Sequence, residues 1–236
     1  MDVEDPEDLG AFGIHLQGDT LVMPLPYPSD SETKDFMLFE AYLAFFDGQR
    51  IQSRYAWKRH LNTLIGYVTH GFTHCEIAFR FLSTDLVHEI WMTCNIYTGE
   101  NLQFEFKTND YNQDKENTLW SLYALDLDKQ RLNALLCHCA VDVRRGVAFN
   151  NMVYWNFLMP RFCRYDGRVQ KVAFCSEHVA TALKRVGCKG FRHIDPCTMD
   201  PTTLYNYVRT KQLFKQVRLS QGIVEEIMAS GGLDLD

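Results

Sequence analysis

A cysteine and a histidine about a hundred residues apart have the side chains needed for nucleophilic catalysis. The cysteine, Cys175, opens a helix-like pattern that ends at Gly187. A thiolate at a helix N-terminus faces unpaired backbone N–H groups and the positive end of the helix dipole, and both lower a cysteine pKa. The same N–H groups can hold an oxyanion that develops during acyl transfer. Cys175 is therefore a candidate nucleophile.

The alternative is that Cys175 is a buried thiol without chemistry. It lies on the apolar stripe of its predicted helix, which continues through Val179, Ala182, Leu183 and Val186. Free cysteine is among the most buried residue types and packs like a small hydrophobic side chain. Taken alone, the helix favours a core thiol, and a nucleophile would also require a base.

His74 is the histidine best placed to be that base. It begins the predicted strand THCEIAFRF, whose apolar face consists of Cys75, Ile77, Phe79 and Phe81. Because side chains alternate along a strand, His74 and Glu76 point to the other face, towards a cleft or solvent. The alternative without a functional role is that His74 and Glu76 lie on a solvated strand face. His178 lies three residues after Cys175 on the same helix and points sideways, so we discount it as the base.

Three segments in this order resemble a known family: THCEIAF, LVHEI and AFCSEHVATALKRVG. They resemble the circularly permuted branch of the NlpC-like, papain-related cysteine hydrolases, in which the histidine strand precedes the cysteine helix. Lecithin:retinol acyltransferase and large-DNA-virus proteins belong to this branch. FCSE opening a helix is the most specific motif, THxE on a strand is the second, and DPCTMDPTTLYNYV resembles the downstream turn and helix. The resemblance covers about residues 36–214 and is closest to the viral members.

The resemblance implies that Cys175 is the nucleophile and His74 the base. In the family a third polar residue comes from the next strand; the pattern fits His88 in one alignment and Glu89 in another, and we expect His88. Glu76 matches a glutamate of some viral-type members and would support the site. The implied activity is a thiol hydrolase acting on a peptide, amide or acyl-lipid substrate. The alternatives are a lipid acyltransferase of the lecithin:retinol type and a catalytically inactive binding or structural viral protein.

The hydrophobic patterns around these residues predict an α+β fold with an antiparallel sheet. Strands are expected near 40–46, 73–81, 86–94, 101–107 and 118–127, and helices near 54–70, 129–145, 150–159, 175–186 and 201–210. Together with the resemblance, this order predicts a papain-like, circularly permuted NlpC-type fold. We expect an acidic, proline-rich N-terminal arm over 1–34, the hydrolase domain over 35–214 and a C-terminal tail over 215–236.

The charge and the hydrophobic pattern of the chain limit the kinds of partner and the location that we expect. The net charge of −6 offers no general polyanion-binding surface, so we expect no nucleic acid partner. No segment approaches the ~18 apolar residues of a membrane span. The start MDVEDPEDLG lacks the basic and apolar parts of a secretory signal, which predicts an intracellular protein, in the host cytoplasm if viral. Aromatic patches such as YWNFLMPRF would allow peripheral membrane contact.

The eight cysteines show no repeated spacing, and free thiols are expected. No C-x-x-C pair is present. The CHC at residues 137–139 is too tight for a chelating loop, and Cys175 with His178 is a lone C-x-x-H. We therefore predict no metal and no cofactor.

Overall fold

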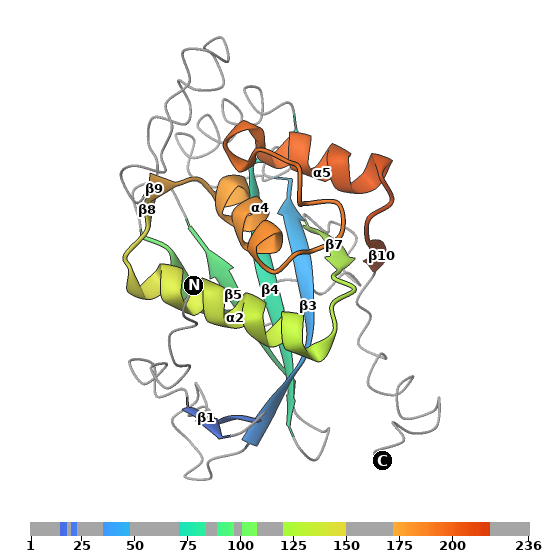
Figure 1. Ribbon diagram of the computed structural model, residues 1–236. Helices are drawn as coiled ribbons and strands as arrows, with labels where there is room; N and C mark the ends of the chain where they lie inside the picture. The colour runs from blue at the N-terminus through green and yellow to red at the C-terminus, as the bar shows by residue number, and fades with distance from the viewer. Residues whose placement is uncertain are drawn as a thin grey trace, which may run out of the picture.

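The computed structural model describes residues 15–17, 20–22, 35–47, 71–83, 89–96, 101–107, 120–149 and 172–217. The helices predicted near 54–70 and 150–159 lie outside these residues. The rest of the predicted order is present: strands come first and helices afterwards, in an α+β arrangement (Figure 1).

One antiparallel sheet of eight strands dominates the described residues. Its strands are β1 (His15–Gln17), β2 (Thr20–Val22), β3 (Asp35–Phe46), β4 (His74–Ser83), β5 (Glu89–Asn95), β6 (Gln103–Lys107), β7 (Trp120–Ala124) and β10 (Lys215–Val217). The long strands β3 and β4 pair at the centre, from Phe36 opposite Ser83 to Phe46 opposite His74. β5 and β6 follow on the β4 side. The central pair therefore carries His74 at one end of the sheet.

Both predicted appendages contribute strands to this sheet. The β1–β2 hairpin, within the predicted N-terminal arm, pairs with the beginning of β3. β10, within the predicted C-terminal tail, pairs with β7, which in turn pairs with the second half of β3. A separate parallel pair joins β8 (Ala148–Phe149) and β9 (Val172–Ala173), directly before the helix of Cys175. Sheet pairing thus extends beyond the region that the sequence assigned to the domain.

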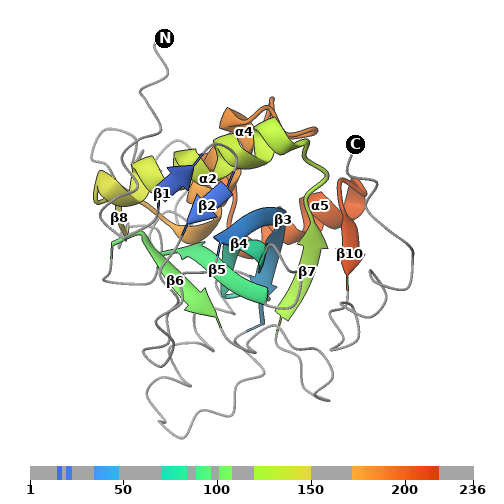
Figure 2. The same ribbon diagram turned by 90° about the horizontal axis from the view of Figure 1, so that it is seen from below.

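Helices α2 (Lys129–Arg144) and α4 (Cys175–Arg185) lie on one face of the sheet (Figures 1 and 2). The predicted helix near 129–145 is confirmed as α2, and its buried stripe includes Leu132, Leu135, Leu136 and Cys139. α4 begins at Cys175 as predicted, and Gly187 after its end has φ +66°, a left-handed conformation that glycine adopts without strain. None of the helices among the described residues is long and apolar enough to cross a membrane.

α5 (Pro201–Thr210) confirms the predicted helix start. Pro201 occupies the first turn, where its missing N–H costs nothing, and the Asp200 carboxylate accepts a hydrogen bond of 2.8 Å from the Thr203 N–H. A short 3₁₀ helix, η6 (Pro196–Thr198), precedes it. These two elements bring residues 195–202 against the beginning of α4, where η6 and α4 are in contact.

The centre of the sheet is buried on both faces. The main core lies between the sheet and the helices and includes the predicted apolar residues of β4. The opposite face holds a second cluster, built from Tyr42, Ala44, Ala78 and Leu122 with Trp91 and Trp120 against it. The interpretation of a solvated strand face is therefore wrong, because aromatic side chains cover it: Trp91 packs on Tyr42 with ring centroids 5.1 Å apart. His74 and Glu76 are buried polar residues, which require partners.

Candidate active site

Cys175 is the first residue of α4, in the place that the sequence predicts. The preceding Phe174 is extended and buried, with φ −106° and ψ 167°, so the helix cannot begin earlier. Phe174 supplies no side-chain cap to the first turn. The N-cap side chain therefore does not occupy the backbone N–H groups at this end of α4, unlike the Ser, Thr, Asp or Asn side chain that usually caps a helix.

The fold brings Cys175 and His74 close enough to shift each other's pKa, although 101 residues separate them in the chain. Cys75, the next residue on β4, is also a neighbour of Cys175, and each of the two cysteines shifts the pKa of the other. Only 7% of Cys175 and 8% of His74 is exposed, so a small part of each is accessible and the rest is embedded in protein. The start of α4 therefore packs directly against the start of β4.

Glu76 is the second partner of His74. Its Oε2 atom lies 3.3 Å from Nε2 of His74, and its side chain is completely buried. The two residues are two positions apart on one strand, which places them on the same face. A carboxylate in this position fixes the orientation of the ring and favours a proton on Nε2. Cys175, His74 and Glu76 are thus neighbouring buried polar side chains, with His74 between the other two.

The pKa values of this group are shifted towards a charged pair. The largest effect on the pKa of Cys175 is the hydrogen bond from Cys75, which lowers it. Burial raises this pKa, but the charge and the hydrogen bond of His74 lower it again, and the result lies well below the usual range. Burial alone would lower the pKa of His74, but Cys175 and then Glu76 raise it to about 9. Near neutral pH the pair is therefore a thiolate and an imidazolium.

Cys75 differs from Cys175 although the two sulfurs are neighbours. Burial, followed by the adjacent Cys175, raises the pKa of Cys75 well above its usual range. Cys75 therefore keeps its proton and donates it in a hydrogen bond to the Cys175 thiolate. Of these two adjacent cysteines, only Cys175 has the protonation state of a nucleophile.

The residues before His74 are attached to α5. The N–H of Phe72 donates a hydrogen bond of 2.7 Å to Oγ1 of Thr202, in the first turn of α5. Gly71 has φ +149°, and a Cβ atom there would lie 3.2 Å from the same Oγ1 atom. A side chain at residue 71 would therefore be strained and would press on the contact that holds the beginning of β4.

The two residues after Cys175, the Ser and Glu of the FCSE motif, are hydrogen-bonded to the segment before α5. Ser176 Oγ donates a hydrogen bond of 2.5 Å to the carbonyl of Met199. The Glu177 carboxylate accepts one of 3.1 Å from Cys197 Sγ. Both side chains are buried. The segment before α5 therefore holds the cysteine helix, and the first turn of α5 holds the beginning of the histidine strand.

The predicted third residue, His88, lies outside the described residues, and its assignment stays a prediction. The backbone of Glu89, the alternative, begins β5 opposite Leu82. Leu82 is eight residues from His74 along β4, or about 26 Å of strand, so Glu89 is not adjacent to His74. The described residue that contacts the His74 ring from the orienting side is Glu76, which the sequence placed on the correct face but in a supporting role.

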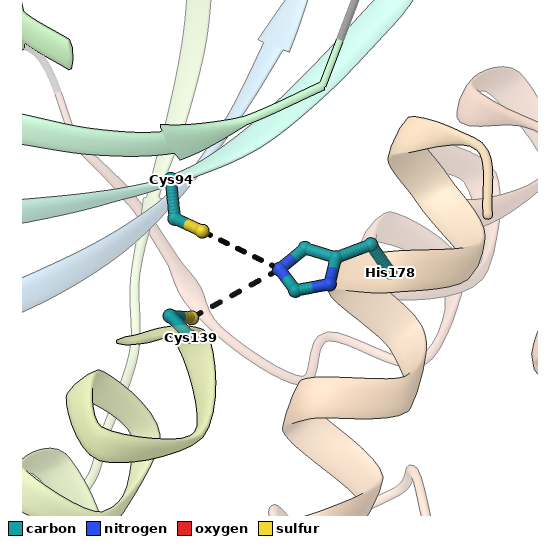
Figure 3. Close-up of side chains that lie close together, drawn as sticks. All are labelled: Cys94, Cys139 and His178. Atoms are coloured by element: carbon teal, nitrogen blue, oxygen red, sulfur yellow. Dashed lines mark hydrogen bonds between the residues drawn. The ribbon is translucent and has the colours of Figure 1, made fainter. Parts of the chain in front are cut away.

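A second cluster brings together three residues that are distant in the sequence. Nε2 of His178 lies 3.5 Å from Sγ of Cys94 and 4.0 Å from Sγ of Cys139 (Figure 3). The structure therefore gives His178 two sulfur neighbours other than Cys175. The prediction of no metal rested on local spacing, whereas these residues come from β5, α2 and α4. The signal available in the sequence was limited to Cys139 on the apolar stripe of α2.

Comparisons with known proteins assign no family: no family model matches the chain, and no curated protein or solved structure is significantly similar to it. The described residues form an α+β fold, with an antiparallel sheet covered by helices.

Proposed function

We propose that this protein is a cysteine-dependent hydrolase with a papain-like, circularly permuted arrangement. Cys175 is the nucleophile, His74 is the general acid and base, and Glu76 positions the imidazole. The observation that carries the proposal is the buried group of Cys175, His74 and Glu76 at the start of α4: Cys175 and His74 shift each other's pKa towards the charged forms, and Glu76 interacts with the His74 ring at 3.3 Å. A nucleophile, a base and a group that orients the base are the three parts that this chemistry requires.

The reaction begins from the thiolate and the imidazolium. The Cys175 sulfur attacks the carbonyl carbon of the substrate, and N–H groups at the start of α4 stabilise the resulting oxyanion. As the tetrahedral intermediate collapses, His74 gives its proton to the departing nitrogen or oxygen. Water then attacks the thioester while His74 takes a proton from it. The carboxylic acid leaves, and the thiolate and imidazolium are restored.

Cys75 and Glu76 support opposite ends of the pair. The Cys75 thiol stabilises the Cys175 thiolate by a hydrogen bond, and the Glu76 carboxylate stabilises the protonated ring of His74. Both stabilise the charged form of the pair, which is the form that attacks. This arrangement explains why successive residues of β4, with side chains on opposite faces, both serve one site.

This chemistry requires a substrate with an electrophilic carbonyl carbon, which an amide, a peptide or an acyl ester provides. If the acyl group passes from Cys175 to an acceptor hydroxyl or amine in place of water, the protein is an acyltransferase of the type that its motifs resemble. A substrate screen separates these outcomes, because only the hydrolase releases free acid in the absence of an acceptor.

The test is a panel of electrophilic activity probes with peptide-like and fatty-acyl recognition groups, applied to the full chain. We expect covalent labelling of the wild-type protein at Cys175 and loss of labelling in Cys175→Ala. Cys188→Ala, which removes another buried thiol of the same core, should label like the wild type. Absence of labelling by every probe, or equal labelling of Cys175→Ala, would contradict the hydrolase and favour a binding protein on this fold.

The role of Glu76 can be separated from that of His88 by comparing Glu76→Gln with His88→Gln. Loss of the Glu76 carboxylate should lower kcat/KM by roughly 10²-fold, because the ring loses its orientation. It should also move the alkaline limb of the pH–rate profile to lower pH, since Glu76 raises the pKa of His74. A merely structural role would leave that limb in place. If His88→Gln shifts the limb and Glu76→Gln does not, His88 is the orienting residue.

A further inference from the structure

Three potential metal ligands converge in the core between the sheet, α2 and α4. They are Cys94 from β5, Cys139 from α2 and His178 from α4, and Figure 3 shows both sulfurs directed at the same ring nitrogen. The three donor atoms all lie within 4.8 Å of one another. We infer that Cys94, Cys139 and His178 bind one Zn²⁺ ion, which fastens α2 and α4 to the sheet.

The distances suit zinc. Bonds of about 2.3 Å to sulfur and about 2.0–2.1 Å to nitrogen, at tetrahedral angles, hold ligand atoms roughly 3.5–3.8 Å apart. The sulfur-to-nitrogen distances of 3.5 Å and 4.0 Å are close to this spacing. Two thiolates and one imidazole form a soft donor set of the kind that selects zinc over magnesium or calcium. Three protein ligands leave a fourth position, which water would occupy.

Burial and charge support the same conclusion. Cys94 and Cys139 have no exposed surface, and His178 is nearly as buried. Two thiolates and a neutral imidazole balance the charge of one Zn²⁺ ion, so the loaded site is neutral and suits an interior of low dielectric. The ligands themselves come from three elements that are distant in sequence. Binding the ion would therefore cross-link the fold and stabilise the native state.

The other nitrogen of the ring also has a suitable neighbour. Oδ2 of Asp142 lies 3.8 Å from Nδ1 of His178 and 2.7 Å from Nη1 of Arg185. A carboxylate on this side favours a proton on Nδ1 and leaves Nε2, the nitrogen that faces both sulfurs, free to bind a metal. Carboxylates in this position commonly orient the histidine ligands of zinc.

Two other interpretations of the cluster fit less well. A second catalytic cysteine would need one sulfur beside the ring nitrogen and a path by which a substrate carbonyl could reach it. Here two sulfurs share Nε2 of His178, and both are fully buried. A Cys94–Cys139 disulfide would leave the imidazole without its sulfur partners, and both cysteines are free thiols in the structure. The test below identifies either alternative.

The position of His178 connects the metal to the candidate active site. His178 lies one helical turn after Cys175 on α4. An ion held jointly by the sheet and α2 would fix the rotation and translation of α4, and so the position of the Cys175 sulfur. The ion is structural and does not contact the substrate. The inference stands independently of the proposed hydrolase activity, since it concerns metal content and stability.

The experiment measures metal in the full chain, purified without chelator from medium supplemented with zinc. We expect about one zinc per chain in the wild type and in Cys188→Ala, and at least a tenfold loss in Cys139→Ala and His178→Ala. Zinc-free protein titrated with Co²⁺ should show the visible bands of a tetrahedral site and thiolate-to-cobalt charge transfer. A chelator should lower the melting temperature of the wild type and leave that of Cys139→Ala unchanged.

Several results would overturn the inference. Wild-type protein that binds neither zinc nor Co²⁺ has no site, and intact-mass analysis that finds a Cys94–Cys139 disulfide identifies a redox pair in its place. Retention of the cobalt spectrum in Cys139→Ala would place the ion elsewhere. If the alanine variants fail to fold, Co²⁺ titration and chelator treatment of the wild type decide the question alone.

Discussion

Cys175 is expected to react with iodoacetamide before any of the other seven cysteines when the full chain is treated briefly at about pH 6. At this pH a thiol of ordinary pKa is less than about 1% ionised, whereas Cys175, stabilised by Cys75 and His74, is a thiolate. A low pKa also reduces intrinsic nucleophilicity, so we expect an advantage of roughly tenfold or more rather than the full ratio of thiolate populations.

Several of the other thiols that the structure describes have specific reasons to react slowly. Burial raises the pKa of Cys188 to about 11, and it also raises the pKa of Cys137. Among the described cysteines Cys139 is the main competitor for the reagent, because the hydrogen bond from Cys94 lowers its pKa to about 6. Its side chain is fully buried, however, and the inferred zinc ion would protect it.

Peptide mapping by mass spectrometry after limited alkylation identifies the labelled residue. Cys175→Ala should lose the rapid label, and Cys188→Ala should keep it. Prior labelling of another cysteine in the folded wild type would count against Cys175 as the nucleophile. Denatured protein provides the control for reagent access, because all eight thiols should then react at similar rates.

His74→Asn is expected to lower kcat/KM by roughly 10²–10⁴-fold, the usual contribution of a positioned general acid and base. It should also raise the pKa of Cys175, because the charge and hydrogen bond of His74 help to keep that pKa low. The variant should therefore alkylate slowly at about pH 6 and recover as the pH rises through the ordinary range of a thiol.

The pH–rate profile of the wild type follows from the signs of these shifts. Activity should fall on the acid side as Cys175 takes up a proton, at a pH well below the usual pKa of a thiol. It should fall on the alkaline side near pH 9, where His74 loses the proton needed by the leaving group. The two limbs belong to the coupled pair and not to either residue alone.

His193→Asn is the matched control for His74→Asn, because His193 is an exposed histidine in the turn before η6. It should keep both the activity and the alkylation rate of the wild type. If His74→Asn retains activity and a low Cys175 pKa, another group activates the thiol and the proposed mechanism is wrong.

Local patterns in the sequence predicted most of the described elements. Alternation identified β4 with its apolar face, and the stripes of α2 and α4 appear as buried faces. The start of α5 at Pro201, capped by Asp200, was readable because a cap and its partner N–H lie within four residues. The hairpin β1–β2 and strand β10 were missed, because short edge strands acquire their pairing from β3 and β7.

The sequence alone determined which residues have the chemistry of the candidate site: a cysteine at a helix start and a histidine at a strand start. Tertiary structure decided their partners. The packing of α4 against β4 makes Cys75 a neighbour of Cys175. The aromatic side chains on the other face of the sheet bury His74 together with Glu76. The Cys94–His178 contact spans 84 residues of chain. Spacing along the chain encodes local periodicity and caps, whereas contacts between distant elements arise only when burial of the apolar faces brings those elements together.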